Sequence, residues 1–375
     1  MKILPNTTFV QSYHRVCSLL LAGRNRALRP PLFARSQHQQ VAFSTGSTAA
    51  AATTTNLLGG RQSERPRRSL LSVPGSDARK IQKATGLKAD AIVLDLEDGV
   101  PLDRKEDARR LVVDTLRQQE ETGNLFGETT EICVRINGLE TGKLALDDLQ
   151  AVLPCTSLQS IVVPKIEHPS DVDFVSRMIS MMTAGSEQGS RRDIRILAAI
   201  ESAKGLLNLK EIAQAGSGNG GPLPPYAAYL DALIFASEDY CADLELIRTP
   251  NGATELLYAR SQLVTVAKAY GLQAIDMVHI DFRNLEDLEK ECQQGREMGF
   301  TGKQAIHPVQ LDTIHATFAP SLKDLEFAKK CVQEYESTTF TGKGACVVDG
   351  IVVDAPVYKW AIKILKRAKQ AGMVE

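Results

Sequence analysis

Short apolar runs alternate with longer amphipathic segments from residue 68 onward, and this alternation limits the possible folds of the chain more than any other feature. Each run is rich in β-branched residues and is bounded by polar residues, glycine or proline, which is typical of β-strands. The segments between the runs carry apolar residues at helical spacing. Eight runs follow one another, at residues 69–75, 91–98, 131–137, 160–167, 195–202, 232–239, 274–281 and 302–308.

This repeated strand–helix unit predicts an α/β chain folded as a (β/α)8 TIM barrel, which we place at residues 66–318. A doubly wound open sheet is the alternative fold. It is disfavoured because the glycine-rich turn that binds phosphate in such sheets is missing after the first run. With 375 residues, the chain is long enough to build a barrel and its hydrophobic core.

Residues 319–375 show a different pattern. Helical spacing returns at residues 321–336 and 356–370, and between these segments Asp349 and Gly350 are flanked by valine-rich stretches. An Asp-Gly pair between β-branched residues is a signal for a hairpin with a type I′ turn. We therefore expect a C-terminal extension of helices and one hairpin, which serves as a lid or as a contact between subunits.

The first 60 residues differ in charge from the rest of the chain. No acidic residue precedes Glu64, whereas seven lysines and arginines do. A segment rich in arginine, serine and alanine but free of acidic residues is typical of a mitochondrial transit peptide. Residues 1–60 are therefore expected to be a transit peptide followed by a disordered linker, which would direct the protein to the mitochondrial matrix. The alternative is a disordered tail without a function.

Composition narrows the classes of partner. The formal net charge of -1 gives no reason to expect nucleic-acid binding, and no apolar stretch approaches the length of a membrane span. The seven cysteines are dispersed and form no Cys-x-x-Cys pair, which argues against a disulfide framework and fits a reducing compartment. The expected partner is therefore a small molecule rather than a nucleic acid or a membrane.

Charged residues gather at the carboxyl ends of the predicted strands. In a parallel barrel these ends meet on one face, where active sites lie. Charges at one end of an apolar barrel cost desolvation energy unless they bind something, so we expect a shared pocket there. The charged residues that end the second to the eighth strand are Asp95, Glu97, Asp98, Arg135, Lys165, Glu167, Glu201, Glu238, Asp239, His279, Asp281 and His307.

Glu201 and Asp239 end adjacent strands and are the best pair of ligands for a hard cation. Mg2+ commonly uses one or two protein carboxylates together with water and substrate oxygens. We therefore expect Mg2+ as the cofactor, with Asp95, Glu97 and Asp98 as supporting carboxylates in the same pocket. The alternative is a salt-bridged pair at the rim of the barrel. Zinc is not expected, because the cysteines are scattered.

Basic residues near the pocket suggest an anionic substrate. Arg135 would clamp a substrate carboxylate through its planar guanidinium. Arg79, Lys80 and Lys83 follow the first strand and would meet phosphates or a second anion, or would form a solvated helix face. A metal and an arginine without a covalent-catalysis motif indicate chemistry through the enolate of a 2-oxo or 2-hydroxy acid. Lys165 offers a Schiff-base alternative, which an acidic residue two positions further on disfavours.

Seven motifs occur in order after residue 67: RSLLSVPG, LDLEDGV, VRIN, VVPKIE, AAIESAKGLLN, ASEDY and GFTGKQAIHP. Together they resemble the citrate lyase beta subunit and HpcH/HpaI aldolase superfamily. The segments YARSQLVTVAKAYGLQAIDMVHIDFRN and GIVVDAP are similar to the branch that cleaves citramalyl-CoA. The resemblance implies a Mg2+-dependent barrel, usually a homotrimer, that acts on acyl-CoA thioesters of 3-hydroxy acids. The implied reaction cleaves citramalyl-CoA to acetyl-CoA and pyruvate through an enolate.

The same resemblance implies roles for single residues. Glu201 and Asp239 match the Mg2+ ligands of the superfamily, and Arg135 matches a residue that binds the substrate carboxylate or carbonyl oxygen. Arg79 and Lys83 match positions that contact CoA or substrate anions.

Asp354, in GIVVDAP, matches an aspartate that acts as an acid/base in the active site of a neighbouring subunit. Its alternative role is to cap the helix that starts at Pro356. The sequence departs from the branch at Ser72, where a tyrosine lies beside the CoA moiety, and at Arg79, which replaces a lysine. Both departures lie at positions that are expected to bind the CoA part of the substrate.

Two alternative functions stay open. One is a related metal-dependent reaction, such as that of a malyl-CoA thioesterase, a malate synthase or an aldolase for free 2-oxo acids. The other is a non-catalytic scaffold, which the complete set of charged strand ends disfavours.

Overall fold

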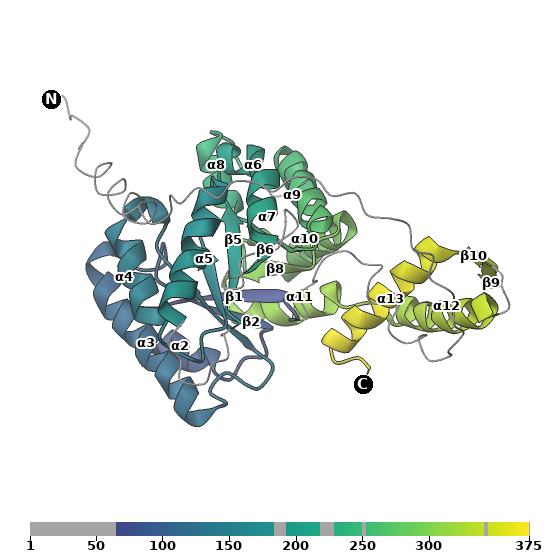
Figure 1. Cartoon of the computed structure of the whole chain (residues 1–375), viewed down its shortest axis with the longest axis horizontal. Coiled ribbons are helices and arrows are strands. Elements are labelled where there is room, and N and C mark those ends of the chain that lie inside the picture. The colour runs from purple at the N-terminus through teal and green to yellow at the C-terminus, as the bar shows by residue number, and fades with distance from the viewer. Residues whose placement is uncertain (1–64, 184–192, 218–228, 250–252, 341–343, 375) are drawn as a thin grey trace, which may run out of the picture. The chain divides into compact units, whose positions relative to one another are not determined.

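A computed structural model describes residues 65–183, 193–217, 229–249, 253–340 and 344–374. The predicted barrel is confirmed, because eight parallel strands pair in chain order and β8 pairs with β1 (Figure 1). The doubly wound open sheet is excluded. The strands are β1 (Ser69–Pro74), β2 (Ala91–Asp95), β3 (Glu131–Arg135), β4 (Ser160–Val163), β5 (Arg195–Ile200), β6 (Tyr229–Phe235), β7 (Gln273–Asp276) and β8 (Gly302–Ala305). The predicted transit peptide and linker, residues 1–60, lie outside the described residues.

The middle residues of most strands are apolar because both faces of the sheet are covered, whereas polar and charged residues concentrate near the strand ends and in β8. In β2, Ala91 and Val93 belong to the cluster inside the barrel, whereas Ile92 and Leu94 pack in the cluster that contains the surrounding helices. Successive side chains of a strand point to opposite faces, so a strand between two apolar clusters shows no alternation of apolar and polar residues. This is why the eight runs can be read directly from the sequence.

Helices follow the strands and cover the outside of the barrel (Figure 1). Their ends follow local chemistry. The side chain of Asn284 accepts a hydrogen bond from the backbone N–H of Asp287 at 3.1 Å at the start of α10, and Gly299, with a φ of 103°, ends that helix. None of the described helices is long and apolar enough to span a membrane. The barrel helices are α2 (Ala78–Ala84), α3 (Lys105–Thr122), α4 (Lys143–Val152), α5 (Pro169–Thr183), α6 (Ala203–Leu207), α7 (Leu209–Ser217), α8 (Ser237–Asp243), α9 (Leu257–Ala269), α10 (Leu285–Met298) and α11 (Leu311–Phe318).

Buried ion pairs fill the amino end of the barrel. The side chain of Arg67 is fully buried, with Nε 2.5 Å from Glu131 Oε2 and Nη1 2.6 Å from Asp231 Oδ2. Burial alone would raise the pKa of Glu131, but the charges of Arg67 and Arg65 hold it at about 2. These groups therefore stay charged and paired, which leaves the carboxyl end of the barrel as the open face.

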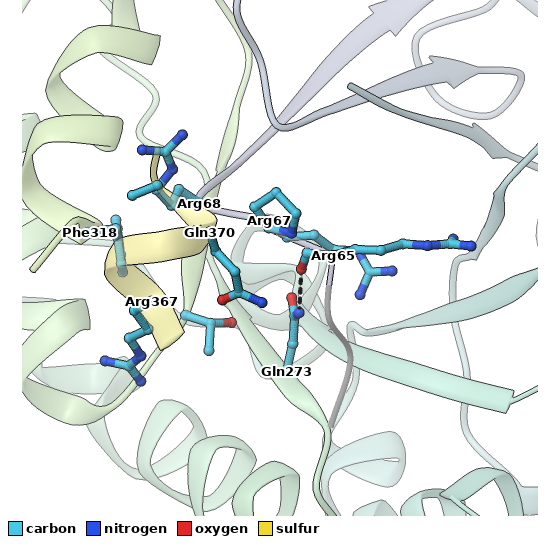
Figure 2. Close-up of a pocket in the computed structure, with 10 residues that line it drawn as sticks. Arg65, Arg67, Arg68, Gln273, Phe318, Arg367 and Gln370 are labelled. Atoms are coloured by element: carbon cyan, nitrogen blue, oxygen red, sulfur yellow. Dashed lines mark hydrogen bonds between the residues drawn. The ribbon is translucent and has the colours of Figure 1, made fainter. Parts of the chain in front are cut away.

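A small cavity lies beside these ion pairs, between the amino ends of the strands and the last turn of α13 (Ala355–Gln370). Its volume is about 60 Å3. Figure 2 shows Gln273 donating a hydrogen bond to the carbonyl oxygen of Arg65, at 2.8 Å, while the guanidinium groups of Arg67 and Arg367 point away from the cavity. Four of the residues that line this small cavity are arginines, namely Arg65, Arg67, Arg68 and Arg367.

The C-terminal extension consists of α12 (Leu322–Phe340), a hairpin of β9 (Cys346–Val348) and β10 (Ile351–Val353), and α13. The predicted hairpin is confirmed, and Asp349 and Gly350 have φ angles of 48° and 82°, as its type I′ turn requires. One side of the hairpin packs on α12 and α13, whereas Val347, Ile351 and Val352 are 66%, 52% and 62% exposed in the single chain. Its role as a lid or subunit contact stays a prediction.

Candidate active site at the carboxyl end of the barrel

The charged ends of β2, β3 and β4 meet in one ion-paired network. Asp95 and Arg135 are the last residues of β2 and β3 and are paired in register. Arg135 therefore binds Asp95 with two parallel hydrogen bonds, Nε to Oδ1 at 2.6 Å and Nη2 to Oδ2 at 2.7 Å. Its Nη1 lies 3.0 Å from Glu97 Oε2, and Lys165 Nζ donates to Glu97 Oε1 at 2.9 Å. The fork of Arg135 is thus held rigidly before any substrate binds.

Backbone geometry supports this network. The carboxylate of Asp95 also accepts hydrogen bonds from the backbone N–H groups of Glu97 and Gly99, both at 2.9 Å. A Cβ atom on Gly99 would approach Asp95 Oδ2 to 2.4 Å, so only glycine fits there. Lys165 has a φ of 53°, a left-handed conformation that costs a non-glycine residue about 1–3 kcal/mol. In this conformation the amine of Lys165 donates its hydrogen bond to Glu97.

The state of Lys165 bears on the Schiff-base alternative. Burial disfavours its cation, but the hydrogen bond to Glu97 and the negative charges of Glu97 and Asp98 outweigh burial and raise the pKa of Lys165. A Schiff base needs a neutral amine, and the ion pair keeps this amine protonated. The arrangement therefore argues against covalent catalysis by Lys165.

Glu201 and Asp239 stand apart from the ion pairs. Glu201 follows β5 directly and is 4% exposed, and its Oε2 atom is buried without a hydrogen-bond partner among the described residues. Asp239 lies exposed in the first turn of α8, after β6. Burial, together with the charges of Glu97 and Asp239, raises the pKa of Glu201 to about 8, although Arg135 and Lys165 oppose the shift. The charges at the ends of several strands thus act together on Glu201.

This pair fits a hard cation. A buried carboxylate without a partner needs either a proton or a positive charge, and within the described part of the chain neither Glu201 nor Asp239 forms an ion pair with a basic side chain. No group of three or more His, Cys, Asp or Glu residues among the described ones is arranged around a single point. Two protein ligands, with water and substrate oxygens in the other positions, is the arrangement that suits Mg2+.

We expect the metal-free protein to lose stability as the pH rises, because of Glu201. Its ordinary pKa of 4.5 rises to about 8 on folding. The folded state therefore holds the proton more tightly, so the contribution of Glu201 to stability is complete below its ordinary pKa and is lost by about pH 8. The free energy of unfolding in urea, measured in EDTA at about pH 5, 7 and 9, should show this loss, and the Glu201→Gln variant should lack it. Equal pH slopes for the two proteins would contradict this assignment.

The residues expected to contact CoA lie on β1 and α2. Ser72 is half-buried in β1, opposite Val93 of β2. Arg79 and Lys83 are exposed on α2, and no described side chain forms an ion pair with either. Asp98 is exposed in the loop after β2. These positions leave the basic residues free to meet an anion, and the CoA contacts stay predictions.

Asp354 acts as a helix cap in the single chain. Its carboxylate accepts a hydrogen bond from the backbone N–H of Val357 at 3.3 Å, at the start of α13, and its side chain is exposed. The capping alternative therefore describes the isolated chain. The role of Asp354 in the active site of a neighbouring subunit stays a prediction.

Sequence reasoning missed two basic residues that support the site. Lys105, the first residue of α3, donates to the backbone carbonyls of Leu96 and Glu97 at 2.8 and 2.7 Å and so fixes the loop after β2. Arg248, in the segment after α8, contacts Glu238. The only available signal was their position, just after strands that end in carboxylates.

Two protein-family models match this chain and together cover the barrel and most of the C-terminal extension. Residues 68–308 match the model described as HpcH/HpaI aldolase/citrate lyase. The chain belongs to the HpcH/HpaI aldolase/citrate lyase family. A second model, described as a C–C bond lyase of the TIM-barrel fold, matches residues 257–373. Membership in this family confirms the predicted resemblance and the expectation of a carbon–carbon lyase.

Individual relatives span most of the chain. Mitochondrial citramalyl-CoA lyase from Homo sapiens is 36% identical over 297 residues, which cover 79% of this chain and 84% of that protein. (3S)-Malyl-CoA thioesterase from Cereibacter sphaeroides strain KD131 is 34% identical over 289 residues, which cover 77% and 90%. The crystal structure of CitE from Mycobacterium tuberculosis, in complex with magnesium, acetoacetate and coenzyme A, has a TM-score of 0.60 at 26% identity. That similarity covers 82% of this chain and 99% of CitE.

Proposed function

We propose that this chain is a Mg2+-dependent acyl-CoA lyase that cleaves citramalyl-CoA to acetyl-CoA and pyruvate. The observation that carries the proposal is the buried carboxylate of Glu201, whose Oε2 atom has no hydrogen-bond partner among the described residues and which lies within electrostatic reach of Asp239 and the fixed guanidinium of Arg135. The similarity to citramalyl-CoA lyase and to a magnesium-containing CitE structure supports it. The similarity to mitochondrial citramalyl-CoA lyase also supports a mitochondrial location.

Glu201 and Asp239 would hold Mg2+, which when bound supplies a Lewis acid that stabilises the negative charge developing on substrate oxygens. Arg135 would orient the substrate. Its side chain is 24% exposed, and the N–H groups that Asp95 and Glu97 leave unused can donate to a carboxylate or a carbonyl oxygen. Because the guanidinium is fixed in advance, it binds without reorganisation. Arg79 and Lys83 on α2 would meet the phosphates of CoA, beside Ser72.

The reaction requires two proton transfers. A base removes the proton of the tertiary hydroxyl, and the bond between the carbinol carbon and the CH2 group next to the thioester breaks. The electron pair of that bond enters the enolate of acetyl-CoA, and the former carbinol carbon leaves as the keto carbon of pyruvate. We propose that Asp354 of a neighbouring subunit in a homotrimer protonates the enolate carbon.

The hairpin gives Asp354 a suitable environment for this step. A carboxyl group donates a proton near neutral pH only when its pKa is raised, and burial among apolar groups raises it. Val347, Ile351 and Val352 are exposed in the single chain. Docking of this apolar face on a second copy would bury them and desolvate Asp354, which could then leave its capping bond.

A malyl-CoA thioesterase is the second candidate, because one such enzyme is 34% identical over most of its length. The two functions share the metal and the acyl-CoA and differ in their products. A thioesterase hydrolyses the thioester of malyl-CoA and releases free CoA, whereas the lyase leaves the thioester intact in acetyl-CoA.

The deciding experiment measures pyruvate and acetyl-CoA released from citramalyl-CoA by the full-length chain, with Mg2+ and with EDTA. We expect cleavage with Mg2+ and none with EDTA. Hydrolysis of malyl-CoA without cleavage of citramalyl-CoA would establish the thioesterase instead. Cleavage of free citramalate at an equal rate would indicate an aldolase that does not need CoA, and no binding of Mg2+ would indicate a scaffold.

A further inference from the structure

Two neighbouring carboxylates in the first turn of α8 have different surroundings. Arg248 forms a short ion pair with Glu238 Oε1 through Nη1, which also lies 3.3 Å from Ser237 Oγ. Asp239, the next residue, has no hydrogen-bond or ion-pair partner among the described side chains. The carboxylate of Glu238 is therefore held by Arg248, whereas the carboxylate of Asp239 remains available to bind a cation.

Arg248 is itself anchored to the neighbouring barrel units. Its Nη2 donates to the carbonyl oxygen of Val278, just after β7, at 2.7 Å, and lies 3.5 Å from both carboxylate oxygens of Glu291 on α10. Its side chain is only 12% exposed. The guanidinium thus joins the first turn of α8, the segment just after β7 and helix α10.

Glu291, the carboxylate that faces Arg248, stays charged at physiological pH. Glu291 binds Lys303 Nζ at 2.5 Å through Oε1 and lies 3.2 Å from His279 Nδ1 through Oε2, and the side chain of Lys303 is fully buried. Burial alone would raise the pKa of Glu291, but the charge of Lys303 and the hydrogen bond from His279 lower it to about 2. The carboxylate that faces Arg248 is therefore a permanent negative charge.

We infer that Arg248 is a positioning residue that selects Asp239, rather than Glu238, as the α8 carboxylate of the metal site. It neutralises and retains Glu238, and it fixes the turn that presents Asp239 next to Glu201. The inference rests on the proposed function, because it concerns the same Mg2+ site. Without Arg248, Glu238 is released and the turn that carries Asp239 loses its link to β7 and α10.

The test measures metal binding directly. Mn2+ binding to the full-length chain is followed by the electron paramagnetic resonance signal of free Mn2+, and Mg2+ competes for the site. We expect Arg248→Ala to weaken binding on the order of tenfold, as for other residues that orient metal ligands. Arg248→Lys should recover part of the loss, because an ammonium group keeps the positive charge beside Glu238 but lacks the planar fork with which Arg248 reaches Glu238 and Val278 at once. The activity of Arg248→Ala should need more Mg2+ for half-saturation, with kcat largely restored by excess metal.

Arg195→Ala is the matched control. Arg195 is 14% exposed and forms an ion pair with Asp193 at 2.7 Å, at the amino end of the barrel. Its loss should lower thermal stability without changing the Mn2+ dissociation constant. The control therefore separates a general loss of stability, caused by removing a half-buried arginine, from a specific loss of metal affinity. Glu238→Gln, which keeps Arg248, should also weaken Mn2+ binding, but by a smaller factor than Arg248→Ala. It replaces Arg248→Ala as the test if that variant does not fold.

The possible outcomes distinguish the inference about Arg248 from the proposed metal site itself. A folded Arg248→Ala protein that binds Mn2+ as tightly as the unchanged chain overturns this inference, and the proposed metal site survives if Glu201→Gln still abolishes binding. Wild-type affinity in both Glu238→Gln and Arg248→Lys, when Arg248→Ala does not fold, also overturns it. Absence of Mn2+ binding to the unchanged chain overturns the inference and the proposed function together.

Discussion

Replacing Glu201 with glutamine is expected to abolish Mg2+ binding and to lower kcat/KM for citramalyl-CoA by roughly a thousandfold or more, since metal stabilisation of the transition state contributes several kcal/mol. The fold should not suffer. Glutamine has nearly the same shape and carries no charge, whereas burial raises the pKa of Glu201 to about 8, so ionising this carboxylate without a metal is costly. The variant should therefore match the metal-free unchanged chain in stability only below about pH 4.5, and it should be the more stable of the two at neutral pH and above.

The measurement combines calorimetric Mg2+ titration, steady-state kinetics and thermal unfolding in EDTA. Glu167→Gln is a suitable control, because Glu167 also follows a barrel strand but is already paired, with Lys204 Nζ at 3.0 Å and Ser202 Oγ at 2.8 Å. That variant should keep Mg2+ affinity within a few-fold of the original. Full metal-dependent activity in Glu201→Gln would remove Glu201 from the metal site and with it the main support for the proposed function.

The barrel and the meeting of charged residues at the carboxyl ends of β2, β3 and β4 could be predicted because both follow from local rules. A strand that is buried on both faces shows a continuous apolar run, as at residues 91–94 of β2, and active-site residues of a parallel barrel lie at the carboxyl ends of its strands. The pair of Asp95 and Arg135 is a consequence of the same rule, since each is the last residue of its strand and the two strands are neighbours.

The supporting contacts could not be predicted, because they join residues that are far apart in the sequence. Arg248 is 30 residues from Val278 and 43 from Glu291, and their meeting depends on how α8 and α10 pack on the barrel. Lys303, inside β8, shows no sign in the sequence that Glu291 will neutralise it. A pattern of spacing describes one element, whereas these contacts describe the relation between elements.

The two roles of Asp354 can be separated by two substitutions at that position. If Asp354 protonates the enolate, Asp354→Asn and Asp354→Ala should both lower kcat, by about 10²- to 10⁴-fold, because neither side chain can donate that proton. If Asp354 only caps α13 through the backbone N–H of Val357, the outcome differs. Asparagine caps a helix as well as aspartate, so Asp354→Asn should be fully active, and only alanine should cost about 0.5–2 kcal/mol of stability. Kinetics and unfolding of both variants distinguish the two roles.

A mixing experiment then shows whether Asp354 works in its own subunit or in another. Asp354→Asn and Glu201→Gln chains are each expected to be inactive, but an assembly that contains both has sites in which an intact Glu201 meets an intact Asp354 from a neighbour. Co-refolded mixtures should therefore regain part of the activity, with a maximum near equal amounts of the two chains. Activity that stays at the level of the separate variants would place Asp354 and Glu201 in the same chain's site, or would leave Asp354 as a cap alone. The apolar face of Val347, Ile351 and Val352 would then need another explanation for its exposure.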